Sequence, residues 1–286
     1  MQELPETDKD RFISRGVSAG FGPQRAALER FVLPAIAFAE EMVDDDAISV
    51  AVSKLGGRPA LRDPSTWPMT SAGQPLSFIA QFNLREIAEL QWLGRELPTD
   101  GLLLFFYDSA GLPRGTRVAE ASQWRVQYEA DVNAVARAEF PPTLGVSQRC
   151  KSATLKGVRQ WTMPFPDTRM VQRLGLGQEL EWNFEELCME SWKASGISLL
   201  GHPFPVQGDM QLLCQFVVNG VTDFKNDPRI PDLEAGIEDW RLLLQLPSRE
   251  QLGMDWDGEG VLYFWIRKQG LENRNFNGVW LQLQTG

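Results

Sequence analysis

The chain is poor in the residues on which most metal and catalytic sites depend. Its 286 residues include one histidine, His202, and three cysteines, Cys150, Cys188 and Cys214. A metal site built on several histidines is therefore excluded, and any Ser-His-Asp or Cys-His arrangement would have to use His202. The odd number of cysteines and the absence of a CxxC pair favour three reduced thiols over a disulfide framework or a zinc site.

Several sequence signatures are also missing. There is no GxxxxGK[ST] or GxGxxG phosphate loop and no GxSxG nucleophile elbow. The N-terminus, MQELPETDKDRF, lacks the basic and apolar regions of a signal peptide. No apolar run approaches the ~20 residues of a membrane span. We therefore expect a cytoplasmic protein without a cofactor, a bound metal or a membrane partner.

The charge of the chain is strongly acidic. It carries 38 Asp and Glu against 28 Lys and Arg, for a net charge of −10. An acidic surface repels phosphate backbones, so we expect no nucleic-acid partner. The charge suits a basic protein partner, although solubility alone also explains it. The residues predicted to form such a partner surface are Asp44, Asp45, Asp46, Asp255, Asp257 and Glu259.

A metal-site interpretation of these acidic groups is weak. The motif DWDGEG over residues 255–260 resembles the start of an EF-hand loop, with glycine at its sixth position. The bidentate glutamate expected at the twelfth position is replaced by Ile266. In the run over 44–46, adjacent side chains do not point to one place. We interpret both groups as acidic turns.

The chain contains two similar segments. GLLLFFYD (101–108) and GVLYFWIR (260–267) are apolar runs that begin with a glycine after an acidic turn, which is typical of a strand buried on both faces. FIAQF precedes the first run and LLLQL the second, while WRVQY and VWLQL follow them. The order is kept while loop lengths differ, as in a duplicated unit. We predict an α+β fold with a mostly antiparallel sheet, two copies of a three-strand unit and a few packing helices.

The chain before the first repeat is expected to contain an arm and a helix. Residues 1–22 are polar and contain glycine, which favours a flexible N-terminal arm. Apolar residues recur at spacings of three and four from Pro23 to about Met42, so we predict a helix there, kinked at its internal proline. The result is a helical extension over 23–46, within a single domain over 23–286.

Three later segments have clear patterns. A helix is expected after the first repeat strand, with Trp92 on its inner face, and another after Asn183, with Trp192 on its inner face. The segment MQLLCQFVV over 210–218 is apolar and favours a strand.

Six short motifs follow one another in a distinctive order. They are LGGRP with Trp67-Pro68, PLSFIAQFNL, LPTDGLLLFFYD, HPFPVQGD, GEGVLYFWIR and VWLQLQ, over about residues 54–286. This order resembles the bacterial YwqG-like family of unknown function. The resemblance implies a single α+β domain with an antiparallel sheet and an internal duplication, but no established chemistry. Members of that family occur near bacterial toxin genes, so the resemblance implies an immunity or other partner-binding role.

Polar residues in apolar surroundings are the remaining candidates for a site. Gln81 and Gln245 occupy equivalent places in two otherwise apolar strands, and a buried amide without partners costs roughly 1–3 kcal/mol. Either each amide bonds neighbouring backbone, which we favour, or the two copies place both around a shared groove. The other members of that groove would be Asn83, His202, Gln207 and Asp209. For His202, a structural role is favoured over catalysis.

Two functions are consistent with these observations. The first is a non-enzymatic cytoplasmic protein-interaction module, such as an immunity protein that binds and neutralises a cognate bacterial toxin through a basic domain. The acidic charge, the scarcity of catalytic side chains and the family resemblance favour it. The alternative is a hydrolase or small-ligand-binding protein that uses a groove near His202, Gln207 and Asp209. No residue is assigned a catalytic role.

Overall fold

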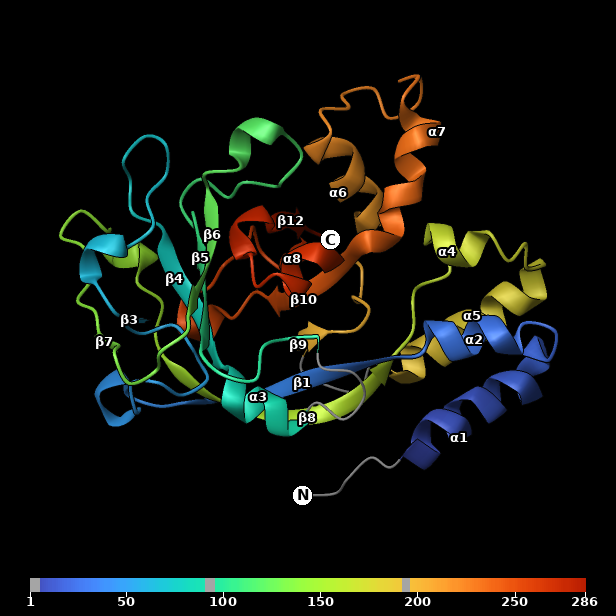
Figure 1. Ribbon diagram of the computed structural model, residues 1–286, viewed down its shortest axis with the longest axis horizontal. Coiled ribbons are helices and arrows are strands. Elements are labelled where there is room, and N and C mark those ends of the chain that lie inside the picture. The colour runs from blue at the N-terminus through green and yellow to red at the C-terminus, as the bar shows by residue number, and fades with distance from the viewer. Residues whose placement is uncertain (1–5, 91–95, 192–195) are drawn as a thin grey trace.

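One large sheet carries the fold (Figure 1), and the computed structural model describes it within residues 6–90, 96–191 and 196–286. Ten strands form this sheet, and the pairs along it run antiparallel. In sheet order they are β12 (Trp280–Gln284), β11 (Val261–Arg267), β10 (Trp240–Pro247), β9 (Ile197–Leu200), β1 (Leu33–Met42), β8 (Ala153–Thr162), β2 (Lys54–Leu55), β4 (Ser77–Asn83), β5 (Leu102–Tyr107) and β6 (Trp124–Glu129). A small second sheet pairs β3 (Ala60–Leu61) with β7 (Ala136–Arg137).

Eight α-helices within the described ranges accompany the sheet, so the α+β class predicted from the sequence is confirmed. They are α1 (Glu6–Gly16), α2 (Arg25–Phe31), α3 (Leu84–Leu90), α4 (Arg169–Gln172), α5 (Gln178–Ser191), α6 (Met210–Val218), α7 (Ile230–Leu233) and α8 (Lys268–Glu272). Helices α1, α2 and α5 pack together beyond one end of β1 and β8 (Figure 1). None of the helices described is both long and apolar enough to cross a membrane. Trp92 and Trp192, expected on inner helix faces, lie outside the described residues.

The two ends of the sheet meet, so the sheet is nearly closed. Trp124 on β6 and Trp280 on β12 lie edge to face, with ring centroids 5.0 Å apart. Their indole Nε1 groups donate to backbone carbonyls at 3.0 and 2.9 Å. We call this contact the Trp124–Trp280 seam. It completes the wall of the core, inside which Phe105 of β5 faces Phe264 of β11 at a centroid distance of 5.1 Å.

Two three-strand units stand at the two ends of the sheet, one made of β4, β5 and β6 and the other of β10, β11 and β12. The central strands β5 and β11 coincide with the runs GLLLFFYD and GVLYFWIR, and their apolar residues are buried as predicted. The first strand of each unit has a register shift, between Phe78 and Ala80 in β4 and between Leu242 and Leu244 in β10. That the units are copies of one another stays a prediction.

The helix predicted over 23–42 is wrong in its second half. Helix α2 ends at Phe31, and strand β1 begins at Leu33. Proline disfavours a helical conformation in the residue before it, so Pro34 ends the helix rather than kinking it. The residues at 35–38 are all buried, and β1 lies in the interior of the sheet between β8 and β9. A strand buried on both faces has no alternation of polar and apolar residues, which is why the pattern was misleading.

The segment expected to be an N-terminal arm, over 1–22, contains packed helical structure. Helix α1 is followed by a π-helical turn over Val17–Phe21. Ile13 and Phe21 are buried, and the Phe21 ring lies 5.6 Å from that of Phe184 on α5. Burial of these apolar side chains stabilises the segment against the rest of the chain.

The strand expected over 210–218 is wrong, since this segment forms helix α6. The carboxylate of Asp209 caps the helix by accepting a hydrogen bond from a backbone N–H three residues later, at 3.1 Å. Met210, Cys214 and Val217 are buried at the helical spacings of four and three. The acidic cap was the signal in the sequence that distinguished helix from strand.

Candidate functional site

The two repeat glutamines are satisfied by backbone groups. Gln81 accepts a hydrogen bond from the Ala60 N–H at 3.0 Å and donates to two carbonyls in the segment 50–52, at 2.7 and 2.9 Å. Gln245 accepts from the Phe204 N–H at 2.8 Å and donates to a carbonyl at 2.8 Å. Both side chains are buried. The favoured interpretation of these amides, that each bonds neighbouring backbone, is confirmed at these contacts.

The other residues of the expected groove hold two different loops. Asn83 donates to the Ala51 carbonyl at 2.6 Å, so it holds the same segment as Gln81. The Gln207 side chain donates to the Thr285 carbonyl at 2.6 Å. Asp209, besides capping α6, accepts from the Arg169 N–H at 2.8 Å. Gln245 and Gln207 therefore both take part in contacts of the loop 201–209, whereas Gln81 and Asn83 hold the segment 50–52.

A third glutamine at the loop 201–209 was missed. Gln284, on β12, is buried, and its side-chain oxygen accepts from the N–H groups of Val206 and Gln207 at 2.9 and 2.8 Å. The signal was present in the final motif VWLQLQ, where two glutamines alternate with apolar residues. Gln245 and Gln284 therefore hold the middle of this loop to the sheet, the first at Phe204 and the second at residues 206–207.

Much of the predicted acidic partner surface is engaged inside the chain. Asp45 accepts from Lys54 at 2.6 Å and from Arg58 at 2.9 Å, and Asp46 pairs with Arg58 and Arg137. The glycine pair of LGGRP permits this arrangement. A side chain at Gly57, whose φ is +68°, would place its Cβ 2.2 Å from an Asp45 carboxylate oxygen. This cluster therefore stabilises the fold.

The second acidic group is a turn held by one contact of its own and one to a distant arginine. The Asp255 side chain accepts from the Gly258 N–H at 2.7 Å, and Asp257 pairs with Arg114 at 2.5 Å. Glu259 is exposed, as is Asp44 in the first group. That these exposed carboxylates contact a partner stays a prediction.

His202 lies in the wall of a cavity of about 370 Å³, which we call the His202 cleft. Its ring Nε2 lies 2.8 Å from the Phe31 carbonyl, which can only accept, so this nitrogen carries the proton. Burial lowers the pKa of His202 to about 4, and the imidazole is neutral at neutral pH. Because the Nε2–H of His202 is bonded to the carbonyl of Phe31, the last residue of α2, the histidine holds the end of that helix beside the cleft. This contact agrees with a structural role.

Arginines dominate the charged lining of the His202 cleft. Arg30, Arg173 and Arg241 line it together with one carboxylate, Glu238. Arg173 pairs with Glu238 at 3.0 Å, and an Arg241 guanidinium nitrogen donates to the backbone carbonyl of Glu238 at 2.5 Å. Arg30 is exposed. Two of the three cations are therefore positioned by neighbouring groups.

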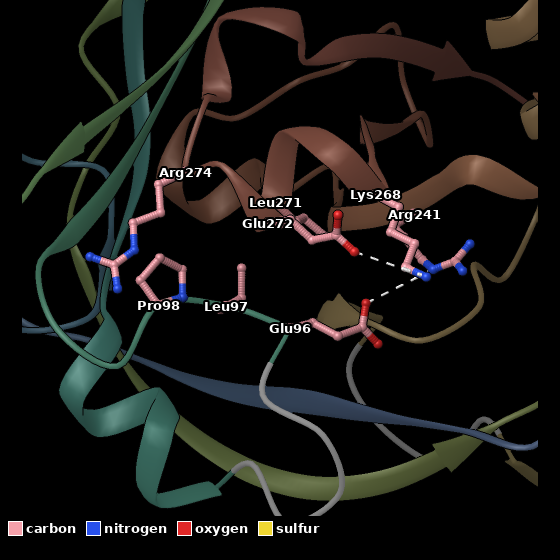
Figure 2. Close-up of a pocket in the computed structure, with 8 residues that line it drawn as sticks. All are labelled: Glu96, Leu97, Pro98, Arg241, Lys268, Leu271, Glu272 and Arg274. Carbon is pink, nitrogen blue, oxygen red and sulfur yellow. Dashed lines mark ion pairs between the residues drawn. The ribbon is translucent and has the colours of Figure 1, made fainter.

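A second cavity, of about 450 Å³, adjoins the first through Arg241, and we call it the Arg241 cleft (Figure 2). Its charged lining is Glu96, Arg241, Lys268, Glu272 and Arg274. Glu96 and Arg241 are 4.0 Å apart, as are Lys268 and Glu272, and Figure 2 shows Arg274 on the side opposite Arg241. Burial raises the pKa of Glu96, which the Arg241 charge partly opposes.

Taken together, the two clefts concentrate positive charge. Five cationic side chains line them against three carboxylates, a formal local charge of +2 in a chain of net charge −10. No local pattern could have predicted this, because the five cations come from α2, the end of α4, β10, α8 and the segment after α8. The arrangement is suited to binding an anion.

Comparison with known proteins places the chain in a family without an assigned activity. No curated protein matches the chain. A model of the family described as domain of unknown function DUF1963 matches residues 53–285, which include most of the sheet and the acidic turn at 255–259 but not the acidic run at 44–46. The match begins at residue 53, two residues before the motif LGGRP, which starts at Leu55. The chain therefore belongs to the DUF1963 family of unknown function.

Proposed function

We propose that the protein binds a small organic anion in the His202 and Arg241 clefts. The observation that carries the proposal is the local excess of positive charge in two adjoining cavities of a strongly acidic chain. A cleft whose lining has an excess of one sign of charge concentrates ligands of the opposite sign. Arg241 lines both cavities, so it is the residue that a ligand in either one would meet.

The lining also indicates the chemical character of the anion. A guanidinium group offers paired N–H donors that match a carboxylate or a phosphate. The apolar walls, including Phe31, Leu174 and Trp265 in the His202 cleft, suit an apolar body attached to that group. The indole Nε1 of Trp265 is buried and has no acceptor among the residues that the structure describes. A polar atom of the ligand would satisfy this donor.

The proposal is tested by replacing Arg241 with glutamine. A set of aliphatic and aromatic carboxylates and organic phosphates is screened by thermal shift, and the best ligand is measured by calorimetry. Because a hydrogen bond to a charged group contributes roughly 1.5–3 kcal/mol, Arg241→Gln should weaken binding by about tenfold or more. The Tm of the unliganded variant is recorded as well, since Arg241 also donates to backbone carbonyls.

Arg85→Gln is the matched control, because Arg85 belongs to an exposed pair with Asp100 and lines neither cleft. It should leave the affinity unchanged. The proposal is wrong if no anion in the set raises the Tm, or if Arg241→Gln and Arg85→Gln bind equally well.

A protein-interaction role is the second candidate, and one observation on α5 favours it. Trp182 is 68% exposed and Met189 is 50% exposed, two helical turns further along the same helix. Glu181, Glu185 and Glu186 surround them and are exposed. Large aromatic side chains at exposed positions are typical anchors of protein interfaces. The partner proposed for this surface is a basic protein segment, such as the toxin domain that the YwqG-like resemblance implies.

Replacing Trp182 with alanine tests this second function. Wild-type and Trp182→Ala baits are used to capture proteins from a host lysate, at low and then moderate salt, and the affinity of a purified captured partner is measured. Loss of an anchor costs about 2 kcal/mol or more, so Trp182→Ala should weaken binding roughly 30-fold without changing the Tm. Met42→Ala, at another exposed apolar side chain, should bind as the wild type does. Equal affinity of the two variants would remove α5 from the interface.

A further inference from the structure

A third cavity lies on the other side of α8 from the Arg241 cleft. Helix α8 contributes Lys268, Leu271 and Glu272 to the Arg241 cleft, but Gln269 and Gly270 to this cavity. Residues one apart on a helix do not face the same way, so the helix separates the two spaces. The cavity has a volume of about 480 Å³. We call it the amide cavity.

Side-chain amides make up most of the polar lining of the amide cavity. They belong to Gln269, Asn273, Asn275 and Asn277, which follow one another at the end of α8 and in the loop before β12. Among the described residues, no carboxylate lines the cavity. It therefore differs from both arginine clefts, where charged pairs form much of the lining.

The hydrogen-bonding capacity of these amides is largely unused. The Asn275 side-chain oxygen accepts from the Asn277 N–H at 3.1 Å. Within the described part of the chain, no hydrogen bond from the four side-chain NH2 groups to another protein group is formed. Each amide thus keeps two donors for a ligand or for water, and three keep their full acceptor as well.

One cation lines the amide cavity, and neutral groups hold it. The Arg267 guanidinium donates to the Gln215 side-chain oxygen at 3.0 Å and stacks over the Trp240 ring, 4.8 Å from its centroid. Arg267 is therefore a fixed donor at the wall of the cavity. Trp240 and Trp280 add rigid aromatic walls, and both are buried.

We infer that the amide cavity binds a neutral polyhydroxylated ligand, a sugar of one or two rings. A hydroxyl group both donates and accepts, and a primary amide offers both functions in a fixed plane. Four such amides beside a fixed arginine can therefore bond several adjacent hydroxyls at once. A cavity of 480 Å³ is within the range of small-molecule sites. This site is separate from the organic-anion site, so either can exist without the other.

The inference is tested with sugars added to the full-length protein. Glucose, galactose, N-acetylglucosamine, maltose and trehalose are screened by saturation-transfer NMR, and affinities are measured by titration. At least one should bind to the wild type. The double variant Asn273→Ala/Asn277→Ala should bind at least about tenfold more weakly, because each lost hydrogen bond contributes about 1 kcal/mol. Both side chains are exposed, so the Tm should change little.

A second variant blocks the cavity without removing an amide. Gly278 lines the cavity, and a Cβ at this position would meet no atom within 4 Å. Gly278→Leu should therefore fold normally and abolish sugar binding. Gly177→Leu is the control, because a Cβ at Gly177 would also meet no atom within 4 Å and Gly177 does not line the cavity. Gly253 is not used for this purpose, since its φ of +72° would strain any side chain. Failure of every sugar to bind, or binding that survives both variants, would overturn the inference. Neither outcome bears on the proposed binding of an organic anion, because that proposal concerns the other two cavities.

Discussion

Replacing Asp45 with alanine should lower the free energy of unfolding by about 3–5 kcal/mol, because the change leaves a buried charge without its partner. Lys54 is fully buried, and its Nζ lies 2.6 Å from the Asp45 carboxylate and 2.8 Å from the Arg58 carbonyl. Burial lowers the pKa of Lys54, and Asp45 opposes that effect. Without the carboxylate, Lys54 must lose its proton or draw water into the core, and either response costs stability. Urea unfolding at neutral pH measures the change.

Asp44→Ala is the control for this experiment, since Asp44 is exposed and accepts only a local hydrogen bond from the Asp46 N–H. Loss of such a cap costs about 1 kcal/mol. The double variant Asp45→Ala/Lys54→Met removes both charges and should cost less than Asp45→Ala and Lys54→Met added together. Equal stabilities of Asp44→Ala and Asp45→Ala would show that the Asp45–Lys54 pair contributes little to the free energy of unfolding.

Acidification should destabilise the protein through its single histidine by about 3 kcal/mol. The pKa of His202 is lowered from 6.5 to about 4 in the folded state, first by burial, and the nearby Arg241 charge acts in the same direction. Below pH 6.5 the histidine of the unfolded chain takes up a proton, whereas in the folded chain it stays neutral until the pH approaches 4. This contribution to stability is therefore fully present above pH 6.5 and is lost as the pH falls towards 4.

The effect is isolated by comparing wild type with His202→Gln at about pH 7 and about pH 4.5. Glutamine can still donate to the Phe31 carbonyl but does not titrate. The carboxylates titrate in both proteins, so their contribution cancels. On acidification the wild type should lose roughly 2–3 kcal/mol more of its unfolding free energy than the variant does. The same pH dependence in both proteins would mean that His202 is protonated at little cost in the fold.

Long apolar runs predicted the two central strands, β5 and β11, correctly. Such a run does not, however, distinguish a strand buried on both faces from a buried helix. The runs in β5 and β11 were long, lay between turns and were read correctly as strands. The segment over 35–38 has the same continuous burial, but its spacing also matched a helix. Segment 210–218 failed in the opposite direction, although Asp209 stood at the position of a helix cap. In both cases the apolar pattern alone was ambiguous, and the local signals, Pro34 in the first segment and the Asp209 cap in the second, distinguish strand from helix.

The candidate sites were much less predictable than the sheet. Arg30, Arg173 and Arg241 are far apart in the sequence and share no motif, so only the fold brings them to one cavity. Burial of Lys54 was also hidden, because lysine is rarely buried and nothing beside it is unusual except an acidic run nine residues earlier. The amides at Asn273, Asn275 and others lie in one short segment, but only the cavity beside them suggests a role.

The Trp124–Trp280 seam has a consequence for how the chain folds during synthesis. Its two sides are about 155 residues apart in the sequence, so β6 is made long before β12 can meet it. In the finished fold β6 is an edge strand that meets β12 through the two tryptophan rings and not through strand pairing, and during that interval even this contact is absent. Contacts between distant segments form slowly, and open strand edges favour association with other chains. We expect closure of the seam to come late, so Phe105 of β5 lacks its partner Phe264 until the last strands have been made.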